Sequence, residues 1–210
     1  MKLKMPEQLK IVLFTVALAI LFIAGRGLCE EQNQPFPSYG SGTVEVRLYT
    51  DYFCPPCRAM EPDIEPLLVN LLKKNAIHLT LVDVPFNRLT PLYARYLLYA
   101  LKANNHPEYA FRVRKTLQDA AGKEVGTQEQ IERLFKEKVI AYAAWDPKPV
   151  FDRYNALLKE DKVTATPTCV IIENSRKRVF VGGANIIRAL KALSEPATDG
   201  AIPSGGERRP

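Results

Sequence analysis

The pattern of hydrophobic and polar residues divides the chain into short and long segments. The short segments are rich in β-branched and aromatic residues, which predicts strands at residues 44–50, 77–84, 168–172 and 178–183. The long segments repeat apolar residues every three or four positions, which predicts helices at residues 58–74, 90–103, 127–142, 149–161 and 185–193. The predicted order is β-α-β, a helical block, and then β-β-α.

This order also predicts how the sheet is built. A strand, a helix and a second strand normally form a parallel crossover. The last two strands are joined by a short turn at residues 173–177 and should pair as a hairpin. We therefore predict an α/β fold with a mixed central sheet flanked by helices, and a helical insertion at about residues 88–147 between its two halves.

The N-terminal residues 1–29 have the pattern of a secretory signal. The basic stretch "MKLKMPEQLK" precedes the uncharged run "IVLFTVALAILFIAG", which is short for a membrane-spanning helix. Only Gly25 and Gly27 match the small residues of a cleavage site. The segment is therefore either a cleaved signal peptide or a retained N-terminal anchor. Both predict a periplasmic or otherwise extracytoplasmic protein, and the second adds attachment to the inner membrane.

Composition bounds the remaining parts of the chain. The Pro-, Gly- and Ser-rich residues 30–42 predict a flexible linker, and residues 196–210 lack apolar periodicity and predict a disordered tail. The ordered domain should span residues 43–195, and 47% hydrophobic residues suffice for a core. The net charge of +6 comes from basic residues interspersed with acids, as at residues 131–139, so no nucleic-acid partner is predicted.

The first predicted strand is followed by "FCPPC", in which two prolines separate Cys54 from Cys57. Because Pro55 begins the next helix, the sulfur of Cys54 lies at the positive end of the helix dipole, where a thiolate is favoured. Cys57 lies one turn further and can close a disulfide with Cys54. The spacing indicates a redox pair in which Cys54 exchanges and Cys57 resolves the mixed disulfide.

Two other uses of these cysteines remain as alternatives. A zinc site needs further ligands, but Cys29, Cys169, His78 and His106 are scattered along the chain, so no metal site is predicted. A structural disulfide across so short a loop would add little stability. We expect Cys169 to pack in a buried strand, with a role as a third redox thiol as the alternative.

A second motif lies far along the chain, where Thr166 and Pro167 precede the third predicted strand and are consistent with a cis peptide bond. With the strand and the Cys54–Cys57 pair at a helix N-terminus, this motif resembles the thioredoxin superfamily. The large helical block and "FCPPC" resemble its DsbA-type branch. The resemblance covers residues 43–195 and implies a thioredoxin-like fold with a DsbA-type helical insertion.

The resemblance implies roles for four residues. Cys54 would be the exposed nucleophile and Cys57 the resolving thiol. Pro167 would be the cis-proline, whose loop offers main-chain hydrogen bonds to an extended substrate peptide. Thr166 would contact the disulfide.

Two departures from the family pattern concern the environment of the thiolate. Leu48 stands where many relatives carry a buried acid, and the nearest acid, Asp51, is expected either to cap the turn or to relay protons. Pro55 and Pro56 replace a histidine-containing pair and offer no backbone N–H. Together with Phe53, they form a thiolate environment that should stabilise Cys54 less than in the most oxidising relatives.

These observations predict a thiol-disulfide oxidoreductase that acts most plausibly as a dithiol oxidase on cysteine-containing exported proteins. Its cofactor would be the Cys54–Cys57 disulfide alone, and a membrane partner of the DsbB or quinone-linked type would reoxidise it. We expect a monomer. The alternatives are a disulfide reductase or isomerase, and a thioredoxin-like copper chaperone or binding module.

Overall fold

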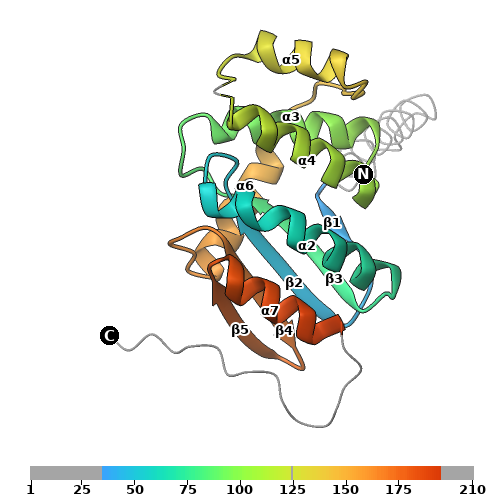
Figure 1. Cartoon of the computed structure of the whole chain (residues 1–210), viewed down its shortest axis with the longest axis vertical. Helices are drawn as coiled ribbons and strands as arrows, with labels where there is room; N and C mark the ends of the chain where they lie inside the picture. The colour runs from blue at the N-terminus through green and yellow to red at the C-terminus, as the bar shows by residue number, and fades with distance from the viewer. Residues whose placement is uncertain (1–34, 124, 195–210) are drawn as a thin grey trace, which may run out of the picture. The chain divides into compact units, whose positions relative to one another are not determined.

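The computed structural model describes residues 35–123 and 125–194, which form a sheet with helices on both faces (Figure 1). The strands are β1 (Ser38–Tyr39), β2 (Val44–Thr50), β3 (Ile77–Asp83), β4 (Thr168–Glu173) and β5 (Arg176–Val181). Their order across the sheet is β1-β3-β2-β4-β5. Only β2 and β3 pair in parallel, and the other neighbours are antiparallel, so the predicted mixed sheet is confirmed.

The helices of the described residues are α2 (Pro55–Lys73), α3 (Thr90–Ala103), α4 (Pro107–Ala121), α5 (Gln128–Glu137), α6 (Lys148–Glu160) and α7 (Gly183–Ser194). In Figure 1, α2 and α7 lie side by side across one face of the sheet, and α3, α4 and α5 gather beyond one end of it. The helices between β3 and β4 interrupt the β-α-β and β-β-α halves, as predicted.

Strand β2 lies at the centre and turns alternate side chains toward the two faces. Thr50 faces α4, because its Oγ1 accepts a hydrogen bond from Arg114 Nη2 at 2.8 Å. Arg47 and Tyr49 face the opposite side, where Arg47 Nη1 lies 2.7 Å from Glu160 Oε1 at the end of α6. Each face of β2 is therefore buried beneath helices.

The predicted flexible linker at residues 30–42 is wrong for the part that the structure describes. Ser38–Tyr39 forms an edge strand that pairs antiparallel with β3, and the side chain of Tyr39 is buried. Gly40 then turns away with a φ of +79°, and a Cβ there would lie 2.5 Å from the carbonyl oxygen of Ile77. The prediction failed because this strand is held by pairing with distant residues and has no periodicity of its own.

Helix α5 is shorter than the predicted helix over 127–142. Its start is as expected, since Thr127 and Gln130 form a capping box. The helix ends at Glu137, and Val139 adopts a left-handed φ of 53°. The N–H of Ile140 then bonds back to the carbonyl of Phe135 at 2.8 Å, which turns the chain and buries Ile140.

The calls on residues 1–29 and 196–210, including Cys29, lie outside the described residues. Over residues 35–123 and 125–194, every helix is too short or too polar to cross a bilayer.

Candidate active site

The loop between β2 and α2 holds Cys54 in the N-cap position of α2, with φ −79° and ψ 113°. The carboxylate of Asp51 fixes this loop, because it accepts hydrogen bonds from the N–H of Phe53 at 2.7 Å and of Asn87 at 2.9 Å. The N–H of Cys54 donates to the carbonyl of Asp51 at 3.2 Å. Asp51 is therefore a turn cap, as one of its two predicted roles required.

The two cysteines of the motif differ in their access to solvent. Cys54 is partly exposed and Cys57 is fully buried, and both are free thiols. Burial raises the pKa of the Cys57 thiol to about 12, and a hydrogen bond with Cys54 adds to this shift. An external sulfur can therefore reach Cys54, whereas Cys57 is reached from within the protein.

The second motif lies directly against the first. The Thr166–Pro167 peptide bond is cis, and the Sγ of Cys54 donates to the carbonyl oxygen of Thr166 at 3.4 Å. Thr166 thus contacts the cysteine through its main chain. The N–H of Gly182 donates to the carbonyl of Pro167 at 2.9 Å, which anchors this loop to the start of α7.

The residues around Cys54 supply few donors to its sulfur. Pro55 and Pro56 occupy the first two helical positions, are exposed, and lack an N–H. Among the described residues, the backbone N–H that reaches Cys54 Sγ is that of Cys57, at 3.4 Å. The ring of Phe53 packs edge-on against Tyr93 in α3, with centroids 4.9 Å apart, so it supports the loop from the helical insertion.

The remaining cysteine of the described chain lies in the sheet. Cys169 in β4 pairs across the strands with Leu48 in β2, and both side chains are buried. Burial raises the pKa of the Cys169 thiol to about 12. The expectation that Cys169 packs in a buried strand is confirmed.

Behind the cysteines lies a buried group of charged residues that the sequence analysis did not identify. Arg114 of α4 contacts Asp83 at 3.0 Å (Nη1 to Oδ1) and Glu61 at 3.4 Å (Nε to Oε1). All three side chains are nearly inaccessible, and Tyr52 donates to the second oxygen of Asp83 at 3.0 Å. A signal was present, because Glu61 and Arg114 each lie on the apolar stripe of their helix.

The two histidines lie away from these residues. His78 Nε2 is 2.8 Å from Ser38 Oγ in the pairing of β1 with β3, and His106 is the N-cap residue of α4. Over residues 35–123 and 125–194, no group of three or more histidine, cysteine or acidic side chains is placed to hold a metal ion.

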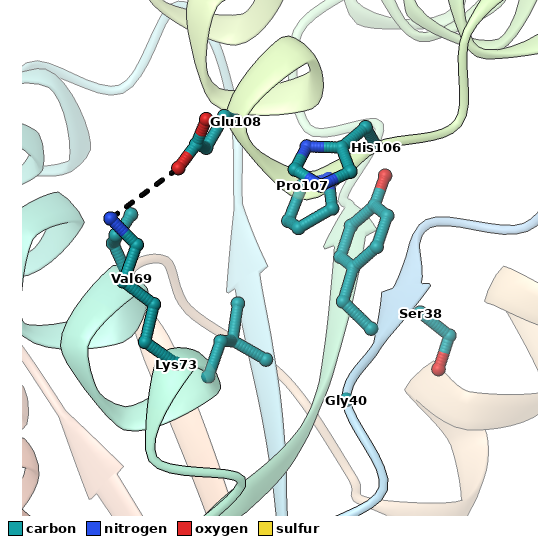
Figure 2. Close-up of a pocket in the computed structure, with 9 residues that line it drawn as sticks. Ser38, Gly40, Val69, Lys73, His106, Pro107 and Glu108 are labelled. Carbon is teal, nitrogen blue, oxygen red and sulfur yellow. Dashed lines mark ion pairs between the residues drawn. The ribbon is translucent and has the colours of Figure 1, made fainter.

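A cavity of about 460 Å³ lies at the other end of α2 (Figure 2). It is lined by β1, by the last turns of α2 and by the first turn of α4, where Lys73 Nζ and Glu108 Oε1 form an ion pair at 3.5 Å. A helix as long as α2 spans about 28 Å, so this cavity is separate from Cys54.

Several solved structures share this fold. A periplasmic thioredoxin-like protein from Salmonella enterica serovar Typhimurium is 20% identical with a TM-score of 0.57, covering 77% of this chain and 89% of its own. The catalytic domain of Proteus mirabilis ScsC is 18% identical with a TM-score of 0.57 and coverages of 77% and 90%. Wolbachia pipientis alpha-DsbA1 is 14% identical with a TM-score of 0.56 and coverages of 76% and 92%.

Sequence comparison gives a more direct result. A search of curated proteins found no match. A family model described as thioredoxin matches residues 40–179, which is more than half of the chain. The matched segment contains the Cys54–Cys57 pair and the Thr166–Pro167 loop, and the chain belongs to the thioredoxin family.

Proposed function

We propose that the protein is an extracytoplasmic thiol-disulfide oxidoreductase that acts as a dithiol oxidase on exported proteins. The observation that carries this proposal is the asymmetry of the cysteine pair: Cys54 is open to solvent at a helix N-terminus, and Cys57 is buried behind it. Such asymmetry separates an attacking or attacked sulfur from a resolving one. No other cofactor is required, because the Cys54–Cys57 disulfide carries the two electrons.

In the proposed reaction, a client thiolate attacks Cys54 Sγ of the oxidised protein. The Cys54–Cys57 bond breaks, Cys57 leaves as a thiolate, and a mixed disulfide joins Cys54 to the client. A second client thiolate then attacks its own disulfide-bonded sulfur and releases reduced Cys54. The client gains one disulfide and the protein becomes a dithiol, so a partner must take up two electrons to restore it.

The proposed location and partners follow from the N-terminal pattern and from the relatives. Residues 1–29 have the composition of an export signal or anchor, and one relative of similar fold is described as periplasmic. We propose that clients are cysteine-containing exported proteins, held as extended chains against the Thr166–Pro167 loop. A membrane redox protein of the DsbB or quinone-linked type would reoxidise the monomer.

The sparse donors around Cys54 favour a second candidate direction, reduction or isomerisation. Each hydrogen bond to a thiolate stabilises the reduced protein and makes the disulfide more oxidising. Pro55 and Pro56 remove two such donors, which leaves the N–H of Cys57. The reduction potential therefore decides between the two directions.

The experiment is an equilibrium titration of the Cys54–Cys57 couple with glutathione. A potential above about −200 mV supports the oxidase, and one below about −250 mV supports a reductase. In an assay of disulfide formation in a reduced client peptide, Cys54→Ala should abolish turnover, and the matched variant Cys169→Ala should retain it. Full activity of a folded Cys54→Ala protein would refute the mechanism.

A further inference from the structure

The buried thiol of Cys57 needs a partner for its proton. When the dithiol is oxidised, Cys57 must become a thiolate before it can attack the sulfur on Cys54. Its side chain has no exposed surface, and burial raises its pKa to about 12. Water cannot collect the proton directly, so a base inside the protein must be available.

Glu61 lies one helical turn beyond Cys57 on the same face of α2, a spacing that brings side chains together. Its side chain is buried, with Oε1 held by Arg114 Nε at 3.4 Å. Within residues 35–123 and 125–194, its second oxygen, Oε2, is buried with no hydrogen-bond partner. Buried carboxylate oxygens are normally paired, so this one is open to receive a donor.

The other buried acids near the site have no oxygen to spare. Asp83 uses Oδ1 for Arg114 at 3.0 Å and Oδ2 for the hydroxyl of Tyr52 at 3.0 Å. Asp51 uses its two oxygens for the N–H groups of Phe53 and Asn87. Glu61 is therefore the carboxylate in this region whose geometry leaves room for a proton from Cys57.

One more turn along α2, Glu65 connects Glu61 with the surface. It is partly exposed, and its pKa is raised by burial and by the charge of Glu61. On the facing helix α4, Arg114 and the exposed Lys115 oppose this shift. Cys57, Glu61 and Glu65 thus form a row at i, i+4 and i+8 that runs from the buried thiol to solvent.

We propose that Glu61 takes the proton of Cys57 when that thiol attacks Cys54, and that Glu65 exchanges it with solvent. The inference rests on the proposed function. With oxidised glutathione as the oxidant, Cys54 thiolate first forms a mixed disulfide and releases one glutathione thiolate. Cys57 then gives its proton to Glu61, attacks Cys54 Sγ and releases the second glutathione thiolate, so two electrons pass from the dithiol to glutathione.

The test is a rapid-mixing experiment on the reduced protein with oxidised glutathione, quenched in acid and analysed by intact mass. The mass of the glutathione adduct separates its formation at Cys54 from its resolution by Cys57. In Glu61→Gln, adduct formation should keep its rate, and resolution should slow by about tenfold to a hundredfold, the usual contribution of a positioned base. The matched control is Asp63→Asn, which removes an exposed carboxylate from the same helix and should change neither step.

The pH profile separates proton transfer from a structural effect. In Glu61→Gln, resolution should depend on hydroxide and rise about tenfold per pH unit, more steeply than in the wild type. If Glu61→Gln does not fold, Glu65→Gln serves instead, and about a twofold slowing of resolution alone is expected because the proton leaves Glu61 more slowly. Wild-type resolution rates and pH profiles in these variants would overturn the proposal. If the wild type itself formed no adduct at Cys54, the proposed function would fail first.

Discussion

Two buried arginines bind carboxylates on opposite faces of the sheet, and they differ in their access to water. Arg47 faces α6 and contacts Asp161 at 3.1 Å and Glu160 at 2.7 Å. Lys177 and the hydroxyl of Tyr49 also contact Asp161. Because Glu160 and Lys177 are partly exposed, water and several partners share the charge of this cluster.

Arg114 has no such support. Its side chain is 1% exposed, and its carboxylate partners, Glu61 and Asp83, are 7% and 2% exposed. The cluster lies on the side of the sheet that carries the cysteines, and it leaves one oxygen of Glu61 without a partner. The comparison indicates that the Arg47 cluster fastens α6 to the sheet, whereas the Arg114 cluster keeps a charged group dry and incompletely satisfied beside a reactive thiol.

Replacing each arginine with methionine should produce the largest difference between the two clusters. Arg114→Met leaves two buried carboxylates without their cation, which should cost about 3–5 kcal/mol of unfolding free energy. Arg47→Met leaves Asp161 paired with Lys177 and should cost about 1–2 kcal/mol. Urea unfolding followed by circular dichroism measures both, and equal losses would show that burial does not distinguish the clusters.

Removing one tyrosine hydroxyl from each cluster is a milder change. Tyr52→Phe takes a donor from the sealed carboxylate of Asp83, which should cost about 2–3 kcal/mol. Tyr49→Phe takes a donor from Asp161, which retains Arg47 and Lys177, and should cost about 1 kcal/mol. The same unfolding assay applies, and a larger loss for Tyr49→Phe would reverse the proposed ranking.

The smallest expected effect is a difference in pH dependence, of at most about 1.4 kcal/mol per pH unit for one proton. Burial acts to raise the pKa of Asp161, but Lys177, Tyr49 and Arg47 together hold it below its usual value. Its stabilising contribution is therefore present above the unfolded pKa of about 3.9 and is lost as the pH falls through the lower folded pKa.

Asp83 should show the opposite sign. Burial raises its pKa above the usual value despite the contact with Arg114. The folded protein then binds this proton more readily, so stability decreases as the pH rises between the unfolded and folded pKa values. Unfolding free energies from pH 3 to 7 should show the deficit of Asp161→Asn narrowing at low pH and that of Asp83→Asn widening. Parallel curves for the two variants would contradict this assignment.

The part of the site that sequence predicted is the part encoded over short distances. Cys54 and Cys57 share one turn, and Thr166 and Pro167 directly precede β4, so local geometry and family resemblance together located them. Strand β1 was missed because its two residues are fixed by pairing with β3. Its Pro- and Gly-rich flanks are typical of a linker.

The Arg114 cluster could not be predicted for a different reason. Its contacts join residues 53 and 31 positions apart in the chain, and a charged residue in a helix is usually solvated. The burial of Glu61 and Arg114 becomes evident only when α2 and α4 are placed together. Their positions on apolar stripes were the available signal, and it would have required treating a charge as a core residue.

The Asp51 carboxylate has a consequence for exchanging parts between relatives. It joins the loop that carries Cys54 to Asn87, one residue before the predicted start of the insertion at residue 88. Phe53 adds a second connection through Tyr93 in α3. A chimaera that replaced residues 88–147 alone would therefore cut through a shared joint, and a transplantable helical module has to include the loop at 84–89 and an aromatic partner for Phe53.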